Sequence, residues 1–166
     1  MIVNAGPLAV LLALVLSTFV LTSHATFPEP MTDCLNGKTQ ITTAIPNLVM
    51  KHQLATSKIQ EITNVLMGGT FYPVNSLDVK RGDLLMIIAD AQGMLENINM
   101  MAISLNLPVG PTLDSLRNVH SSAKAVTDGL RPSLTPLVDP ASLTQMFMDA
   151  IVLDQQISAA ANVLMC

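Results

Sequence analysis

Apolar residues recur at alternating steps of three and four along most of this chain. Between residues 41 and 66 they form one continuous stripe, made of Ile41, Ile45, Leu48, His52, Ala55, Ile59, Ile62 and Leu66. Side chains at these steps share one face of an α-helix. Because Pro46 is costly deep inside a helix, we expect a short helix over residues 32–44 and a long one that begins near Pro46 and ends at Gly68 and Gly69.

The segment from residue 69 to residue 82 has no sustained period, and we expect a loop there. Asp83 follows it and can cap a helix that runs to about Asn106. Its stripe is Leu84, Ile87, Ile88, Ala91, Met94, Leu95, Ile98, Met101, Ala102 and Leu105. The Pro-Val-Gly-Pro sequence at residues 108–111 then stops this helix.

Two further helices complete the pattern. Thr112 can cap a helix that closes near Gly129, and its apolar side contains Leu113, Leu116, Val119, Ala123, Val126 and Leu130. Asp139 and Pro140 supply the cap and the first position of a last helix. Its inward positions are Leu143, Met146, Phe147, Ala150, Leu153, Ile157, Ala160, Ala161 and Leu164.

These segments predict the fold class. Amphipathic helices joined by short links pack best around one shared apolar interior. No stretch of alternating β-branched residues competes with this interpretation, and the helices show no internal repeat. We therefore expect an all-α protein, an antiparallel four-helix bundle with a short extra N-terminal helix.

The first residues have the layout of a secretory signal. An apolar run over residues 7–21 is too short to span a bilayer comfortably, and the small residues of Ser23-His24-Ala25 follow it. We expect cleavage after Ala25, which leaves residues 26–166 as one secreted, extracellular domain. No positive side chain precedes the apolar run, and a signal anchor is the alternative. No later segment is apolar for long enough to cross a membrane, so no transmembrane anchor is expected after cleavage.

Composition narrows the choice of partner. Charged residues make up 12% of the chain and aromatic residues 3%, against about 25% charged residues in an average soluble domain. The formal net charge is −4 with no basic cluster, which argues against a nucleic-acid partner. Either the helices pack closely, or apolar surface remains for a ligand, a partner or an interface. No Asn-X-Ser/Thr sequon in residues 26–166 offers a glycan to cover such a surface.

The chain has two cysteines, Cys34 and Cys166. An even number in a secreted protein predicts pairing, either within one chain or between two copies as a homodimer. This placement resembles that of secretoglobins, small secreted helical proteins that pair through such cysteines and enclose lipophilic ligands. The chain is much longer than a secretoglobin subunit and shares no further motif with that family. No functional residue is therefore transferred from it and no family is assigned.

No catalytic or metal-binding motif stands out. His52 and His120 lie alone on separate helices, without the additional ligands at matched spacing that a zinc site needs. We interpret His52, which falls on the apolar stripe, as a core or boundary histidine whose hydrogen bonds are satisfied. Ser121 or Ser122 with His120 and Asp114 lacks the strand-turn-helix context of a catalytic nucleophile. We expect no enzyme activity, no metal and no cofactor.

The carboxylates are spread singly along the helices. Asp83 and Asp139 are predicted helix caps. Five others are predicted to lie on solvent-exposed helix faces, namely Asp90, Glu96, Asp128, Asp149 and Asp154.

Methionine is the more suggestive signal. Unbranched thioethers adapt to irregular shapes, which suits a cavity for lipophilic ligands, although they can equally fill a core that lacks aromatic residues. The methionines of the predicted helices and their ends are Met50, Met67, Met86, Met94, Met100, Met101, Met146, Met148 and Met165.

The leading hypothesis is a secreted, non-catalytic helical protein that binds or carries a small hydrophobic ligand between its helices. From their positions in the stripes, the candidate lining residues are Ile59, Ile62, Met94, Ile98, Val126, Met146, Ala150 and Ile157. The alternative is a structural or surface-active extracellular protein that self-associates through apolar faces. A helical cytokine-like ligand for a receptor is a third hypothesis, for which no residue singles out a surface.

Overall fold

The computed structural model describes residues 29–67, 74–130 and 140–166. These residues form four helices and no strand, which confirms the predicted all-α fold; the helices are α2 (Glu29–Met67), α3 (Val74–Ser104), α4 (Gly110–Gly129) and α5 (Pro140–Asn162). The chain divides into two compact units, Met1–Asp33 and Cys34–Cys166, and the packing described below is that of the second unit. The predicted signal sequence, at residues 1–25, lies outside the described residues.

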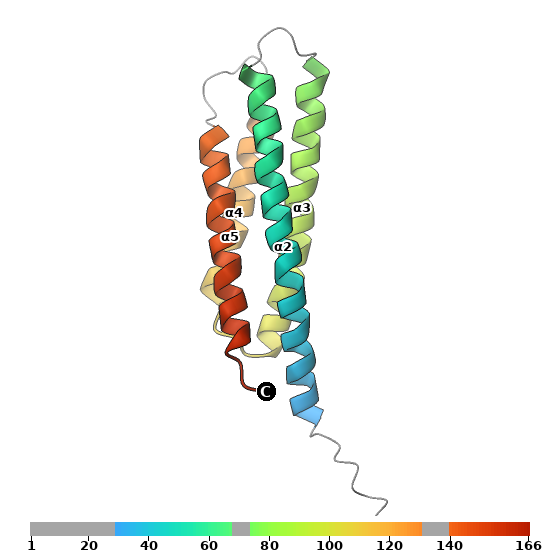
Figure 1. The fold of residues 1–166 in the computed structure, drawn as a ribbon, viewed down its shortest axis with the longest axis vertical. Coiled ribbons are helices and arrows are strands. Elements are labelled where there is room, and N and C mark those ends of the chain that lie inside the picture. Colours follow the sequence, from blue (N-terminus) through green and yellow to red (C-terminus); the bar gives the residue numbers. More distant parts are fainter. Residues whose placement is uncertain (1–28, 68–73, 131–139) are drawn as a thin grey trace, which may run out of the picture. The chain divides into compact units, whose positions relative to one another are not determined.

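Within Cys34–Cys166, the four helices lie side by side as an antiparallel bundle (Figure 1). Ion pairs show the antiparallel register of α2 and α3. Lys51 of α2 pairs with Asp90 of α3 at 2.7 Å, and Lys58, two turns later in α2, pairs with Asp83, two turns earlier in α3, at 3.4 Å. Because exposed ion pairs are each worth less than about 1 kcal/mol, they select this register more than they hold the helices together.

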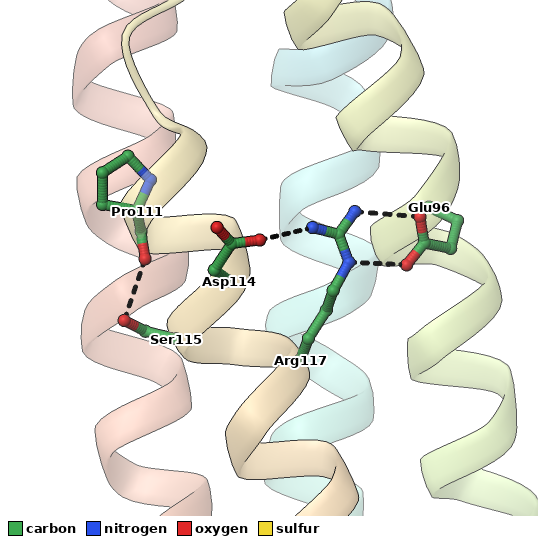
Figure 2. A network of polar contacts seen from close by, with 5 residues as sticks. All are labelled: Glu96, Pro111, Asp114, Ser115 and Arg117. Atoms are coloured by element: carbon green, nitrogen blue, oxygen red, sulfur yellow. Dashed lines mark hydrogen bonds and ion pairs between the residues drawn. The ribbon is translucent and has the colours of Figure 1, made fainter.

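Arg117 connects helices α3 and α4. The Arg117 guanidinium of α4 binds both carboxylate oxygens of Glu96 in α3, at 2.8 and 2.9 Å, and also contacts Asp114 one turn earlier in its own helix (Figure 2). The fork of the guanidinium matches the two oxygens of a carboxylate, so this pair also fixes orientation. The hydrogen bond from Arg117 lowers the pKa of the Glu96 carboxyl below its usual range.

A disulfide and a lysine join the beginning of α2 to the end of α5. Cys34 and Cys166 form a disulfide within one chain, with their Cα atoms 5.7 Å apart. Nearby, the Lys38 ammonium donates hydrogen bonds to the carbonyls of Leu164 at 2.8 Å and Asn162 at 3.2 Å. A cation near carbonyls at the C-terminal end of a helix also compensates the negative end of the helix dipole. We refer to this end of the bundle as the disulfide end.

The buried aliphatic side chains form two clusters along the bundle. The cluster at the disulfide end contains Ile41, Ile45, Leu48, Ala91, Leu95, Ile98, Ala102, Leu107, Val109, Leu113, Leu116, Ala150, Ile157 and Ala161. The cluster toward the other end, which we call the distal cluster, contains Ala55, Ile59, Ile62, Val65, Leu77, Leu84, Ile87, Ile88, Ala123, Leu130, Leu143 and Phe147. Burial of these side chains is the main favourable contribution to folding.

The separate short helix expected before Pro46 is instead the first part of α2, which continues through Pro46 without a break. Pro46 lies on the exposed face, while Ile41, Ile45 and Leu48 on the opposite face are buried. A proline removes the N–H that would bond the carbonyl four residues earlier. On the exposed face water can reach that carbonyl, and the apolar face stays continuous across the site.

The predicted loop over residues 69–82 is also too long, because α3 begins at Val74. Leu77 is 2% exposed and lies seven residues before the buried Leu84, so the apolar stripe of α3 extends two turns further than expected. Lys80 adds an ion pair to Glu61 of α2 at 2.6 Å. Asp83 is accordingly inside the helix and does not cap it.

The connection between α3 and α4 is tightly folded. Asn106 has a φ of 56°, and the N–H of Leu107 bonds the carbonyl of Ala102 at 2.9 Å, an arrangement that commonly ends helices. A Cβ atom on Gly37 of α2 would lie 2.9 Å from the Leu105 side chain. Glycine at this position therefore allows α2 to approach the end of α3 closely.

None of the described helices is both long enough and apolar enough to cross a membrane.

Removal of the disulfide by the double substitution Cys34→Ala and Cys166→Ala is expected to lower the free energy of unfolding by 2–5 kcal/mol, a range typical of native disulfides. The bridge joins residues separated by 132 positions, and in the chain-entropy model a loop of that length contributes about 5 kcal/mol by restricting the unfolded chain. Urea denaturation of the oxidised protein and of the double variant measures the difference. Equal midpoints and slopes would contradict the prediction.

Candidate functional site

Three polar side chains occupy positions in the apolar stripes of three different helices. We call the inward-facing stripe of each helix its seam. His52 lies between Leu48 and Ala55 in the seam of α2, His120 between Leu116 and Ala123 in that of α4, and Asp154 between Ala150 and Ile157 in that of α5. His52, His120 and Asp154 have no exposed surface. The seam spacing thus brings them into the interior, at the junction of the two aliphatic clusters along α2 and α4.

His52 bridges the other two residues. Its Nδ1 atom lies 2.7 Å from Oδ2 of Asp154, and its Nε2 atom lies 2.8 Å from Nε2 of His120. The ring of Phe147 lies beside it, with the ring centroids 5.9 Å apart. The three residues therefore form one hydrogen-bonded polar layer that joins α2, α4 and α5.

Burial shifts the pKa values of the outer two members in opposite directions. Desolvation raises the pKa of Asp154, although the hydrogen bond and the charge of His52 oppose the rise. Desolvation lowers the pKa of His120 to about 4, and the charge of His52 contributes to the decrease. Both shifts favour the uncharged form of a group that water cannot reach.

The hydrogen-bond network assigns the protons of the layer. Burial favours an uncharged Asp154, and a carboxylic acid with its proton on Oδ2 donates it to Nδ1 of His52. The Nε2 atom of His52 then carries a hydrogen and donates it to Nε2 of His120. The single proton of neutral His120 is consequently on its Nδ1 atom.

Two polar atoms of the layer have no hydrogen-bond partner. They are Nδ1 of His120 and Oδ1 of Asp154, and both are buried. An unpaired buried donor or acceptor costs about 1–3 kcal/mol. His52 itself has a partner at both ring nitrogens, as the sequence predicts, whereas the two outer members of the layer each leave one atom unpaired.

The arrangement suits hydrogen bonding better than metal coordination. In the described ranges, no group of three or more His, Cys, Asp or Glu side chains is placed to hold a metal ion. Two nitrogens bound to one tetrahedral zinc ion lie about 3.3 Å apart, given Zn–N distances of about 2.0 Å. The 2.8 Å between the imidazoles of His52 and His120 is instead that of a direct hydrogen bond.

The eight predicted ligand-lining residues separate into two groups. Ile59, Ile62, Val126 and Met146 belong to or pack against the distal cluster. Met94, Ile98, Ala150 and Ile157 belong to or pack against the cluster at the disulfide end. The structure thus divides them into two groups of four, each in or against a different aliphatic cluster.

Two grooves on the described surface of the bundle are lined by residues other than the eight predicted ones. A groove of about 420 Å³ separates the second half of α2 from the beginning of α5, and Thr56, Gln60, Thr63, Asn64, Met67, Pro140, Ala141, Thr144 and Gln145 line it. A groove of about 630 Å³ lies between α2 and α3, and Thr39, Gln40, Thr43, Ala44, Asn47, Asn97, Met100 and Met101 line it. Both are rich in uncharged polar groups, unlike the aliphatic interior.

The methionines lie mostly outside the core. Among the described residues, none is in the fully buried set, and Met94, Met101 and Met146 pack against it from partly buried positions. Those with large exposed fractions are Met31, Met50, Met67, Met86, Met100, Met148 and Met165. Aliphatic residues therefore fill the interior, and most thioethers face solvent.

Asp154 is the residue that the sequence analysis misplaced. The prediction of a solvated position for it was wrong, whereas Asp90, Glu96, Asp128 and Asp149 are exposed as expected. Its position four residues after Ala150 and three before Ile157 was the available signal. A carboxylate and two histidines at seam positions of three helices indicate that they meet inside the bundle.

Replacement of Asp154 tests whether its interaction with His52 stabilises the fold. Asp154→Ala leaves the buried Nδ1 of His52 without a partner and is expected to lower the free energy of unfolding by about 3 kcal/mol. Asp149→Ala removes an exposed carboxylate of the same helix, and we expect a change within about 0.5 kcal/mol. Chemical denaturation of both variants measures the contrast. Similar small losses would show that the buried carboxyl contributes little.

Acidification is expected to destabilise the protein through His120. Its pKa is about 4 in the folded protein and about 6.5 in the unfolded chain, so between these pH values only the unfolded state binds the proton. Folding stability attributable to this group is complete above pH 6.5 and decreases by about 3 kcal/mol as the pH falls to 4. The raised pKa of Asp154 has the opposite sign, because the folded state holds that proton more tightly and gains stability at low pH.

Denaturation curves at a series of pH values, compared between the wild type and His120→Gln, isolate this contribution. Glutamine can accept the hydrogen bond from His52 but does not titrate, so the variant should lose less stability between pH 6.5 and pH 4. All other titrating groups are common to both proteins and cancel in the difference. Parallel pH profiles would show that His120 is not the source.

No family model, curated protein or solved structure matches the chain.

Proposed function

We propose that this chain is a secreted, non-catalytic helical protein that binds a small hydrophobic molecule between its helices. The observation that carries the proposal is the distal cluster. It brings Ile59 and Ile62 of α2 together with Val126 of α4 and Met146 of α5, beside the ring of Phe147. An aliphatic and aromatic interior formed by several helices is the usual environment of a lipophilic ligand.

The distal end is also better suited to opening than the disulfide end. The chain has only two cysteines and both are in the bridge at the disulfide end, so no disulfide restrains the distal cluster. Val126 and Met146 are partly buried, and the thioether of Met146 can change its conformation to fit a guest. A ligand can therefore enter by separating helices at this end, while the disulfide holds the other end.

The disulfide supports the extracellular part of the proposal. Structural disulfides persist in oxidising compartments and are rare in the cytosol. The apolar run at residues 7–21 has the layout of a signal sequence, as the sequence analysis predicts. N-terminal sequencing of the protein exported by a secreting host, which should begin at Thr26, examines this part separately.

Binding is tested with a fluorescent fatty-acid analogue and with native mass spectrometry of the oxidised protein for co-purified lipid. Val126→Phe fills the distal interior with a larger side chain and is expected to weaken binding of the probe at least tenfold. Val119→Phe is the matched control, because Val119 is also partly buried, lies two turns earlier in α4 and packs against the cluster at the disulfide end. It should leave binding unchanged.

Circular dichroism and thermal melting establish that both variants remain folded. A wild-type protein that carries no lipid and does not bind the probe contradicts the proposal. Equal weakening by the two substitutions contradicts the distal location.

Self-association at the surface is the second candidate function, and α3 supplies the observation that favours it. Four large apolar side chains of this helix are 62–69% exposed, namely Val79, Met86, Met100 and Ile103. Exposed apolar surface of this kind can mark an interface or a surface-active face. Light scattering and surface tension measured against protein concentration distinguish the candidates, since a carrier stays dispersed and leaves the air-water interface unchanged.

A further inference from the structure

Helices α2 and α5 are joined more firmly at the disulfide end than at the distal end. At the disulfide end, the Cys34–Cys166 bridge and the hydrogen bonds from Lys38 to the carbonyls of Asn162 and Leu164 connect α2 to α5. Further along the same pair of helices, the connection is the hydrogen bond between His52 and Asp154. Along α2 and α5, the polar layer is therefore the boundary between a half that a disulfide joins and a half that none joins.

An additional proton on His120 has no favourable place in this layer. In the protonation state argued for the layer, His52 donates its Nε2 hydrogen to Nε2 of His120 across 2.8 Å, and the proton of His120 is on Nδ1. A second proton on His120 can only bind at Nε2, where it would face the hydrogen of His52. Two N–H groups cannot share this distance, and an imidazolium charge in an aliphatic interior is costly to desolvate.

We propose that the layer of His52, His120 and Asp154 is a proton-operated latch: protonation of His120 separates it from His52 and opens the distal half of the bundle, while the disulfide end stays closed. Opening separates the two facing N–H groups. It also gives water access to the imidazolium of His120 and to its unpaired Nδ1 hydrogen. It needs no bound ligand, so this inference goes beyond the proposed function and does not depend on it.

No group that faces the layer supplies a negative charge to stabilise a protonated His120. The facing groups are His52 from α2 and Asp154 from α5, while the buried side chains of α3 in the described range are all apolar. Lys51, which precedes His52 in α2, forms an exposed ion pair with Asp90 of α3. Burial raises the pKa of Asp154, and its uncharged form offers no negative charge to stabilise an imidazolium in the interior.

The other charges on α4 and α5 point outward. Arg117 is paired with Glu96 and Asp114, Lys124 lies beside Asp128, and Asp149 accepts a hydrogen bond from Gln145 at the surface. None of these groups compensates a positive charge at the centre of the bundle. A protonated His120 is therefore stabilised only by exposure to water.

Opening has a defined structural consequence. The distal cluster would become accessible, including Ile59 and Ile62 of α2 and Leu143 and Phe147 of α5. Ile41, Ile45 and Leu48 at the disulfide end would remain covered. Were a hydrophobic molecule held in the distal cluster, mild acid would release it.

Hydrogen exchange followed by mass spectrometry tests the latch on the oxidised full chain at pH 7.5 and pH 5.0, with labelling times scaled to the intrinsic exchange rate at each pH. We expect protection in residues 55–65 and 143–147 to fall at least tenfold at the lower pH. Protection in residues 41–48 and 157–161 should change less than twofold. The variant His120→Gln, which keeps an acceptor for His52 but cannot titrate, should keep both halves protected.

Asp149→Asn is the matched control, because it removes an exposed carboxylate from α5 and should behave like the wild type. If His120→Gln does not fold at pH 7.5, His120→Asn replaces it, since that side chain also cannot titrate. Equal loss of protection in both halves of the wild type, or the same distal loss in the non-titrating variant, would overturn the proposal.

Discussion

A carboxyl group inside an aliphatic bundle must meet its partners at one level along the helix axes. Asp154 has His52 as its hydrogen-bond partner, and His52 in turn bonds His120, so three helices depend on one another at this point. A slip of α5 by one turn would leave the carboxyl among side chains that offer no hydrogen bond. The aliphatic residues provide most of the driving force for collapse but tolerate such a slip far better, and the polar layer therefore specifies the alignment.

The helical bundle was predictable because burial of an apolar face requires the three-and-four spacing, which is visible in one dimension. The disulfide was equally accessible, since two cysteines allow only one pairing within a chain. The break at Pro46 was predicted from local cost alone, and the structure shows why that was insufficient: the proline is exposed and the apolar face continues beneath it. The helical residues before Asp83 were missed because a short apolar repeat at Leu77 was outweighed by nearby turn-forming residues.

The polar layer was harder to predict, because it depends on contacts between helices far apart in the sequence. His52 and Asp154 are separated by 102 positions, and His52 and His120 by 68. Each looked ordinary by itself, a lone histidine or one carboxylate among several. Only their common seam position relates them. In α5 this position was hard to recognise, because the neighbouring Leu153 was assigned to the inward face instead of Asp154. The candidate ligand-lining residues illustrate the same limit, since helix periodicity predicts which side faces inward but not at which level along the bundle a side chain lies.

The placement of the methionines has a chemical consequence. Thioethers are the side chains that mild oxidants attack most readily after thiols, and oxidation converts them into polar sulfoxides. In this protein the most accessible sulfur atoms, such as those of Met67, Met86 and Met165, are on the outside, and the fully buried described positions contain none. Oxidative damage would thus make the exterior more hydrophilic and leave the interior packing intact.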